Sequence, residues 1–253
     1  MTSRKIHILI GATGSVASIK IPVLVRLLLQ VSISSGGERR PYIHRHSEGA
    51  IFSFSVQQDE NFEVKIVPTV AATHFFKAEE VSDVEVLTDA DEWKVRLLTL
   101  SPLLFQAVAL TFLTFMWSKK TDPVLHIELR NWADILLLSP LDANTLAKIA
   151  NGLCDNLLTC ILRAWDPLRP VIACPAMNTN MWEHPFTAKH LSVLTEALGF
   201  RIVAPIQKLL ACGDLGIGAM AEPETIVKYM RQVLAETKMA REARTAEDIG
   251  GDA

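Results

Sequence analysis

The sequence predicts an α/β fold in which a parallel sheet is covered by helices on both faces. Short apolar runs of strand length alternate with helical stretches along most of the chain, which is the pattern of repeated βαβ units. These runs are almost continuously apolar, as Ile6–Ile10 is, and such runs are typical of strands buried on both faces. The expected strands are 6–10, 62–67, 133–139, 171–174 and 201–204, and the clearest helices are 21–29, 190–198 and 224–236.

Composition fits one folded domain. The chain has 253 residues, of which 49% are hydrophobic and 21% charged. Because a domain takes roughly 100–200 residues, we expect a single domain over 1–236, followed by a charged, small-residue-rich tail over 237–253 that we expect to be disordered. The 25 Lys and Arg residues nearly balance the 28 Asp and Glu residues, with a net charge of −3 and no basic block. This balance argues against nucleic-acid binding.

The four cysteines show no CxxC spacing and no density typical of a disulfide-rich secreted domain. No Cys/His set has zinc spacing, so we expect no metal site. The N-terminus predicts a strand where a signal peptide would need a longer apolar region. We therefore expect a reducing, cytoplasmic location. Cys154, Cys160 and Cys174 lie in apolar contexts and are expected to be inert core residues.

Two segments do not fit the alternation and are interpreted as insertions, at about 31–60 and 95–116. The second contains Leu97–Trp117, 21 residues without a charge, which passes the threshold of roughly 18–20 residues for a membrane-spanning helix. Pro102 and Gln106 interrupt the run, and a span there would separate strands that must pair in one sheet. We therefore expect an insertion and no membrane association.

The first candidate site is the turn Gly11–Val16, which follows the first strand and opens a helix. Glycines there let backbone N–H groups approach an anion, and the helix N-terminus adds positive potential. The spacing is neither G-x-G-x-x-G nor a P-loop. An ordinary tight turn also explains it, although a mononucleotide phosphate is favoured once the other loops are counted.

Two more loops follow expected strands. Pro140–Thr145 contains Asp, Asn and Thr, which either cap a helix or hydrogen-bond a ligand at the sheet edge. Pro175–Trp182 places an Asn among apolar residues, which suggests a shaped loop that offers a polar group, while its Met and Trp also suit a core. Carboxyl ends of parallel strands meet at one edge of a sheet, so these loops should converge.

The last candidates are Cys212 and His126. Three glycines surround Cys212 within 210–222, which predicts a flexible, exposed loop that closes over a pocket. A Cys in such a loop suits an acid/base or nucleophilic role. His126 lies in an amphipathic helical stretch, four residues before Arg130 on the same face. A lone His is more often a structural or surface residue than a catalyst. A functional role for His126 therefore depends on which other groups lie close to it.

Together these segments resemble the homo-oligomeric flavin-containing cysteine decarboxylase family. The resemblance covers most of residues 5–30, 62–94 and 117–236. Its motifs are GATGSVA (11–17), DEW (91–93), DPVLHIELRNWAD (122–134), PLDANTLAKIANGLCDNLLTCILRAWD (140–166), PAMNTNMW (175–182) and ACGDLGIGAMAEP (211–223). It implies a flavodoxin-like or Rossmann-like three-layer fold, with FMN bound at the subunit interfaces of a homotrimer.

The resemblance also implies roles for individual residues. His126 and Cys212 would be an acid/base pair, and Asn178 would hold the substrate carboxylate. Ala211 and Met220 would line the closing loop on the substrate side. The expected FMN contacts are Gly14, Ser15, Val16, Thr69, Asp142, Ala143, Asn144, Thr145 and Ala176. Where the family usually has a basic residue, three positions before the loop Cys, this chain has Leu209, next to Lys208.

The implied reaction is FMN-dependent decarboxylation of 4′-phosphopantothenoylcysteine to 4′-phosphopantetheine, in coenzyme A biosynthesis. The cysteinyl carbon is first oxidised to a thioaldehyde, because direct loss of CO₂ would leave an unstabilised carbanion. The alternative is a regulatory relative that inhibits a Ser/Thr protein phosphatase, although the acidic tail of such relatives is absent here. The two insertions have no counterpart in the family. We interpret them as translated introns or gene-model errors, which transcript sequencing tests, and an inactive mis-spliced form is a further alternative to the enzyme.

Overall fold

The computed structural model describes residues 4–29, 62–92, 123–209 and 215–250. Its centre is a six-stranded parallel sheet with strand order β3-β2-β1-β4-β5-β6, beside a separate antiparallel hairpin of β7 and β8. The strands of the sheet are β1 (Ile6–Ala12), β2 (Phe62–Pro68), β3 (Glu85–Val86), β4 (Ile135–Leu141), β5 (Val171–Pro175) and β6 (Arg201–Ile202). Without the short edge strand β3, the order is that of flavodoxin-like sheets; with it, the order is that of Rossmann sheets.

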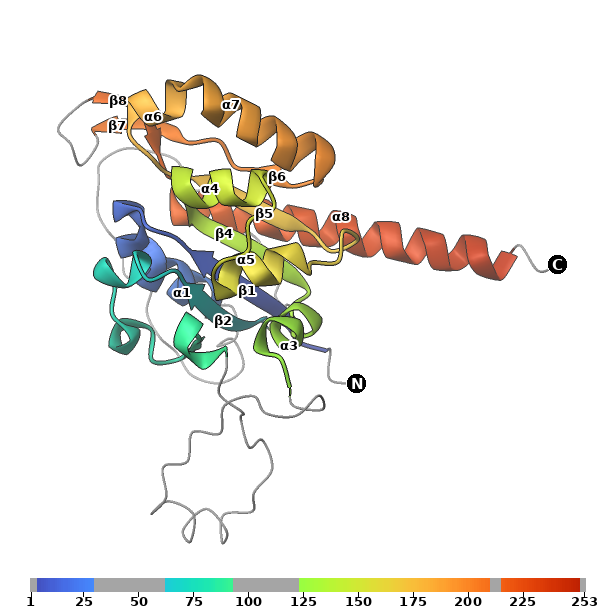
Figure 1. The fold of residues 1–253 in the computed structure, drawn as a ribbon. Helices are drawn as coiled ribbons and strands as arrows, with labels where there is room; N and C mark the ends of the chain where they lie inside the picture. The colour runs from blue at the N-terminus through green and yellow to red at the C-terminus, as the bar shows by residue number, and fades with distance from the viewer. Residues whose placement is uncertain (1–3, 30–61, 93–122, 210–214, 251–253) are drawn as a thin grey trace, which may run out of the picture.

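Helices cover both faces of the sheet, which gives three layers (Figure 1). The helices are α1 (Ile21–Leu29), α3 (Leu125–Trp132), α4 (Ala143–Ala150), α5 (Leu157–Arg163), α6 (Thr179–Glu183), α7 (Pro185–Ser192) and α8 (Pro223–Gly250). Helices α1 and α8 pack on one face, while α3, α4 and α5 pack on the other. The predicted three-layer α/β fold is confirmed.

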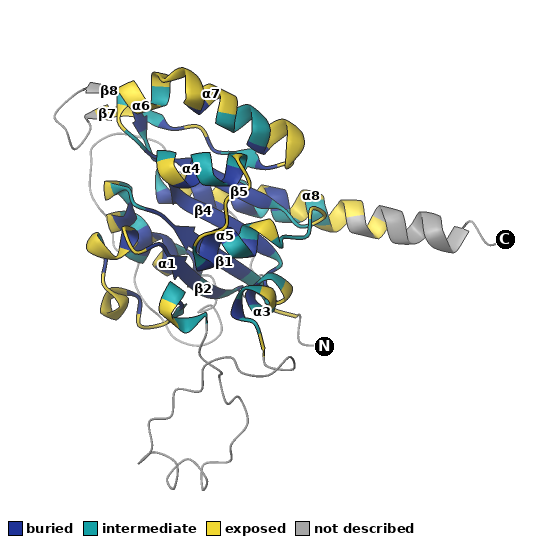
Figure 2. Ribbon diagram, in the orientation of Figure 1, coloured by how far each residue is buried: buried dark blue, intermediate teal, exposed yellow. Residues whose placement is uncertain are grey.

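Alternate residues of the central strands β1 and β4 supply the two cores. In β1, Ile8 and Ile10 face α1 and α8, whereas Leu9 faces the α3–α5 layer. All three side chains are fully buried. This period of two, with both sets apolar, explains why the strands are continuous apolar runs in the sequence. The dark central sheet in Figure 2 shows the same burial.

The predicted strand positions are correct to within about two residues, but several elements differ from expectation. The expected helix 190–198 is α7, which continues into a π-helical turn, Val193–Ala197. The sequence interpretation missed β3 and α5, and also the hairpin of β7 (Ile206–Leu209) and β8 (Leu215–Ala219). These elements are too short to show a clear hydrophobic periodicity, on which the sequence assignment relies.

Helix α8 does not end at Glu236 as expected but continues to Gly250. The expectation of a disordered tail from 237 is therefore wrong for the residues up to 250. Ala, Arg and Glu are frequent in this stretch and are strong helix formers, so the helix continues after its apolar face ends. Both proposed insertions, including the charge-free run at 97–117, lie outside the described residues.

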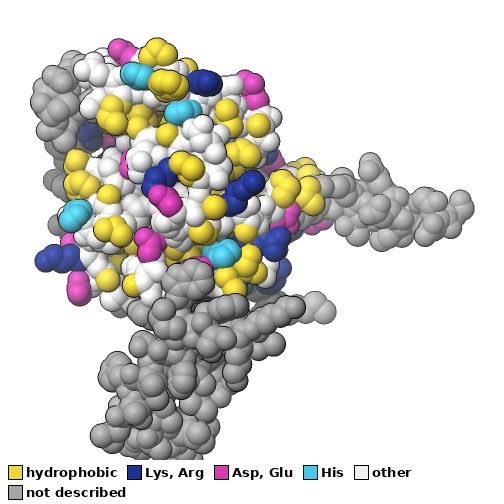
Figure 3. Space-filling model, viewed as in Figure 1, with side chains coloured by type: hydrophobic (Ala, Val, Ile, Leu, Met, Phe, Trp, Pro, Cys, Tyr) yellow, Lys and Arg dark blue, Asp and Glu magenta, His cyan; other side chains and the backbone are white. Residues whose placement is uncertain are grey.

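Within the described residues, no helix is both long and apolar enough to cross a membrane. On the face shown in Figure 3, basic and acidic side chains are interspersed over the described surface.

Candidate functional site

A cavity of about 470 Å³ lies at the carboxyl ends of β1, β4 and β5. This is a usual size for a small-molecule site. Strand order reverses between β1 and β4, and open α/β sheets bind ligands at such a switch point. The lining residues are Gly14, Ser15, Val16, Ala17, Ile19, Lys20, Asp142, Ala143, Asn144, Ala176, Met177, Asn178, Met181, Lys208, Gly218, Ala219 and Met220.

Thr13 joins the loops after β1 and β4. Its Oγ1 donates to the carbonyl of Pro140 at 2.9 Å and accepts from the N–H of Asp142 at 2.7 Å. The side chain is fully buried, so both bonds are shielded from water. Gly14 follows directly, and a Cβ there would lie 2.7 Å from the Cβ of Ala71. Glycine is therefore required at this close approach.

Asp142 caps α4 and lines the cavity. Its Oδ1 accepts from the N–H of Thr145 at 2.8 Å. The buried Thr145 is not among the cavity-lining residues. The capping role considered from the sequence is thus observed, and Asp142, Ala143 and Asn144 also face the cavity.

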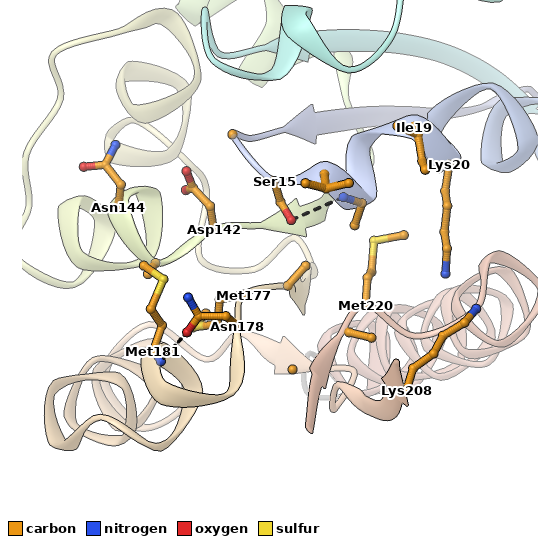
Figure 4. A pocket seen from close by; sticks show the side chains of 17 residues that line it. Ser15, Ile19, Lys20, Asp142, Asn144, Met177, Asn178, Met181, Lys208 and Met220 are labelled. Carbon is orange, nitrogen blue, oxygen red and sulfur yellow. Dashed lines mark hydrogen bonds between the residues drawn. The ribbon is translucent and has the colours of Figure 1, made fainter. Parts of the chain in front are cut away.

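Asn178 begins α6, and its amide has a fixed orientation. Oδ1 accepts from the N–H of Met181 at 2.8 Å, so the N-cap bond occupies the oxygen (Figure 4). The Nδ2 group, which carries two donors, is left to face the cavity. This arrangement suits a ligand that accepts hydrogen bonds, such as a carboxylate.

Strand β8 packs against the loop that follows β5. The N–H of Met177 donates to the carbonyl of Gly218 at 2.9 Å. Gly218 has φ +139°, and a Cβ there would collide with the carbonyl oxygen of Met177. At the end of β8, Met220 Sδ accepts from the hydroxyl of Ser139 at 3.3 Å. Residues 215–219 were expected to belong to a flexible, exposed loop; they form a strand fixed by these contacts.

Two cations reach one side of the cavity, opposite Asp142 and Asn144 (Figure 4). Lys20 donates to Glu222 Oε2 at 2.9 Å, and Lys208 donates to Glu222 Oε1 at 3.1 Å. The hydrogen bond from Lys20, and then that from Lys208, holds the pKa of Glu222 below its ordinary value. The sequence interpretation noted Lys208 but missed Lys20. Lys20 stands six residues after Gly14, in the first helical turns after β1, and this position could have identified it.

The cavity unites most of the residues singled out in the sequence: Gly14, Ser15, Val16, Asp142, Ala143, Asn144, Ala176, Asn178 and Met220. Thr69 and Thr145 are outside its lining. Thr69 follows β2, and its buried Oγ1 has no hydrogen-bond partner within the described part of the chain. Ala211 and Cys212 lie outside the described residues.

His126 lies apart from the cavity, on α3 in the layer that contains α5 (Figure 1). Its Nδ1 is 2.5 Å from Oε1 of Glu92. The described residues that line the cavity do not include His126.

The other cysteines differ from one another. Cys174 on β5 is fully buried, and burial raises the pKa of its thiol to about 12, so it is inert as expected. Burial also raises the pKa of Cys160, which is partly exposed on α5. Cys154 is exposed in the loop before α5, so its assignment to the core was wrong. Its apolar neighbour Leu153 lies in the same loop and is also exposed, whereas the buried apolar residues nearby belong to α4 and α5.

Comparison with known proteins places the chain in a family. Residues 55–235 match the family model named Flavoprotein. The chain belongs to the flavoprotein family. Phosphopantothenoylcysteine decarboxylase of Mus musculus is 42% identical over 233 residues, which are 92% of this chain and 89% of the mouse protein.

Solved structures of related proteins have the same fold as this chain. A mutant PPC decarboxylase complexed with pantothenoylaminoethenethiol has a TM-score of 0.70 at 40% identity and matches 92% of this chain and 100% of its own. The FMN binding protein AtHal3 has a TM-score of 0.65 at 40% identity, covering 92% of this chain and 98% of its own. The flavodoxin-like fold of this flavoprotein is therefore confirmed.

The residues present fit a flavin. The cavity combines apolar lining, from Val16, Ala176 and Met220, with polar groups from three loops, as a ring system bearing polar edges requires. The buried Thr69 Oγ1, which lacks a partner within the described chain, is available to a ligand at the end of β2.

Proposed function

We propose that the protein is an FMN-dependent carboxy-lyase that converts 4′-phosphopantothenoylcysteine to 4′-phosphopantetheine in coenzyme A biosynthesis. One observation carries the proposal: loops from three strands meet in one cavity, in a chain 42% identical to a phosphopantothenoylcysteine decarboxylase over most of both lengths. FMN, when bound, supplies an acceptor for a hydride that is later returned, so no external reductant is consumed.

FMN is assigned to the part of the cavity formed by the loops after β1 and β4. The contacts proposed for it are Gly14, Ser15, Val16, Thr69, Asp142, Ala143, Asn144, Thr145 and Ala176. For Thr145 the role is indirect, since its backbone N–H fixes the Asp142 side chain. The close approach that Gly14 permits and the fixed cap of Asp142 support this assignment.

Asn178 is assigned the substrate carboxylate. Its cap bond to Met181 fixes the amide, and Nδ2 is a donor that faces the cavity. Lys20 and Lys208 are assigned the substrate phosphate, because they place two positive charges at the same cavity. Lys208 thereby compensates for Leu209 at the position where the family usually has a basic residue. Ala211 and Met220 are assigned to the substrate side of the closing loop.

His126 is assigned to take a proton from substrate, and Cys212 to deliver the last proton to product. Because His126 is not among the residues lining the cavity of its own chain, we assign it to the cavity of a neighbouring copy. The site is then shared at the interfaces of a homotrimer. This division explains why His126 sits on a different face of the chain from Asn178.

The first experiment is an absorption spectrum of the purified chain, before and after denaturation and filtration, followed by a decarboxylation assay. A yellow protein that releases stoichiometric FMN and forms 4′-phosphopantetheine is expected. A colourless protein would contradict the proposal for this chain and favour a regulatory relative or a mis-spliced form.

A further inference from the structure

His126 and Glu92 form a close side-chain pair. Glu92 follows the short helical turn Asp89–Asp91, and His126 lies in the first turn of α3. The Nδ1 of His126 is 2.5 Å from Oε1 of Glu92, although the residues are 34 positions apart. The Glu92 side chain is 9% exposed and the His126 side chain 25% exposed. One partner is therefore buried, and the other reaches the surface.

This contact fixes which ring nitrogen carries the proton. A carboxylate accepts hydrogen bonds and donates none, so Nδ1 of His126 must be the N–H donor. In the neutral ring the lone pair is then on Nε2. Nε2 is the nitrogen left to accept a proton from another molecule.

The Glu92 carboxylate relies on His126 as a hydrogen-bond donor. Its second oxygen, Oε2, is buried and has no partner among the residues that the structure describes. The contact with His126 is the side-chain hydrogen bond that the structure gives this carboxylate. A buried carboxylate that loses its hydrogen-bond partner costs the full desolvation penalty of that group. The bond to His126 Nδ1 is therefore one that the Glu92 carboxylate needs, and it holds the two side chains together.

The segment that leads into Glu92 is fixed by hydrogen bonds on its N-terminal side. Asp91 accepts from the N–H and the hydroxyl of Thr88, at 2.8 and 2.7 Å. Asp89 Oδ1 accepts from the N–H of Leu157, at the start of α5, at 2.8 Å. The Thr88–Asp91 bonds stiffen the turn, and the Asp89–Leu157 bond ties it to the helix layer that contains α3, so the residues before Glu92 are fixed before any ligand arrives.

We propose that Glu92 is a positioning residue for His126: it holds the Nδ1–H tautomer and directs Nε2 outward. The proposal deepens the function proposed above and rests on it. No bond of the substrate is made or broken by Glu92, which acts only through the imidazole.

The test combines Glu92→Gln, His126→Asn and the double variant in the FMN-loaded protein. For Glu92→Gln we expect kcat to fall about 10- to 100-fold with KM within about twofold of wild type, as is usual when a supporting hydrogen-bond partner of a functional His is lost. The double variant should be no slower than His126→Asn alone. Glu92 acts only through the His126 ring, so removing Glu92 has no further effect once that ring is gone.

Imidazole ¹⁵N NMR supplies a readout independent of turnover. The chain has 7 His residues, and the spectrum of His126→Asn identifies the His126 signals. Wild type should show a protonated Nδ1 and a bare Nε2, whereas Glu92→Gln should show a mixture of tautomers. The matched control is Asp91→Asn, which removes a neighbouring charge and loosens the same turn without removing the Glu92 carboxylate; it should keep the wild-type tautomer and most of kcat.

Normal kcat and tautomer in Glu92→Gln, with His126→Asn inactive, would overturn the inference and leave the proposed function intact. An equal kcat loss in Asp91→Asn would also overturn it, since the effect would then be structural. Full activity of His126→Asn would refute both roles. If wild type does not decarboxylate the substrate, the proposed function fails, while the NMR signature still shows whether Glu92 fixes the ring.

Discussion

Asn178 illustrates how one side chain combines a structural and a chemical task. Its oxygen caps α6 through the N–H of Met181, and its Nδ2 faces the cavity. Asp also caps helices well, so Asn178→Asp should preserve the cap while replacing a donor with a negative charge. The substitution therefore separates helix capping from hydrogen-bond donation to the ligand.

We expect Asn178→Asp to lower kcat/KM at least about 100-fold, because a carboxylate repels the substrate carboxylate at the position where a donor is needed. FMN content and melting temperature should stay near wild type. Steady-state assays, absorbance and thermal unfolding measure these quantities. Retention of full kcat/KM would remove Asn178 from carboxylate binding.

Glu222 gives a pH prediction at the same scale. Its hydrogen bonds with Lys20 and Lys208 lower its pKa below the ordinary value of 4.5. A lowered folded-state pKa contributes stability that is present above the unfolded-state pKa and is lost as pH falls through the folded-state pKa. Wild type should therefore lose more unfolding free energy than Glu222→Gln between about pH 5 and pH 3. Denaturant titrations at several pH values measure this.

The exposed acid Glu224 provides the control for this experiment. It lies two residues further on, in the first turn of α8. Glu224→Gln should retain the pH dependence of wild type. Parallel curves for wild type and Glu222→Gln would show that the lysine contacts do not persist in solution.

At the scale of elements, the hairpin of β7 and β8 completes the cavity through a glycine. Gly218 has a positive φ, and its backbone contacts Met177 too closely for a Cβ. Gly218→Ala should destabilise the protein by about 1–3 kcal/mol through this strain and should weaken FMN or substrate binding. Chemical unfolding and substrate titration measure the two effects.

Gly152 offers a matched control for this substitution. It also has a positive φ, of 72°, but a Cβ there would meet no atom of the described residues within 4 Å. Gly152→Ala should cost about 1 kcal/mol from backbone strain alone and leave substrate affinity unchanged. If both variants lose affinity equally, the contact with Met177 is not what shapes the cavity.

Helix α8 supplies a second prediction for an element. Its core contacts come from Ile226, Val227, Met230 and Val233, all before Glu236. Deleting residues 237–253 should therefore change the unfolding free energy by no more than about 1 kcal/mol, as for other surface changes. The experiment tests whether 1–236 is the functional domain. A loss of folding or activity would place the boundary later.

At the scale of the whole molecule, separation of His126 from the cavity predicts complementation between copies. His126→Asn should abolish turnover, and Cys212→Ser should stall at the oxidised product, two hydrogens lighter than 4′-phosphopantetheine. If the protein forms the proposed trimer, a site in a mixed trimer that takes His126 from one copy and Cys212 from another regains both residues. Random assortment restores about a quarter of the sites.

Co-expression of the two variants, with product measured by mass spectrometry, tests this arrangement. Each variant alone serves as the control. Activity no higher than that of the separate variants would show that each site draws both residues from the same copy. Analytical ultracentrifugation of wild type reports the number of copies directly.

The site residues show where sequence interpretation succeeds and where it stops. The loops that carry Ser15, Asp142 and Asn178 were identified because each follows a strand, and parallel strands bring such loops to one edge; the roles of the three residues came from the family resemblance. Lys20 was missed because a lysine on a helix is usually a solvated surface residue. Thr13 looked like part of a glycine turn, and its bonding of two loops depends on a residue more than 100 positions away.

The sequence by itself determined the fold class, the main strands and the family, because these follow from local periodicity and from motifs that are contiguous in the chain. The tertiary structure decided how far α8 extends, how β8 packs on Met177, and that His126 pairs with Glu92 away from the cavity. These features depend on contacts between residues distant in sequence. Local propensity carries no information about such contacts, and only chain packing selects them.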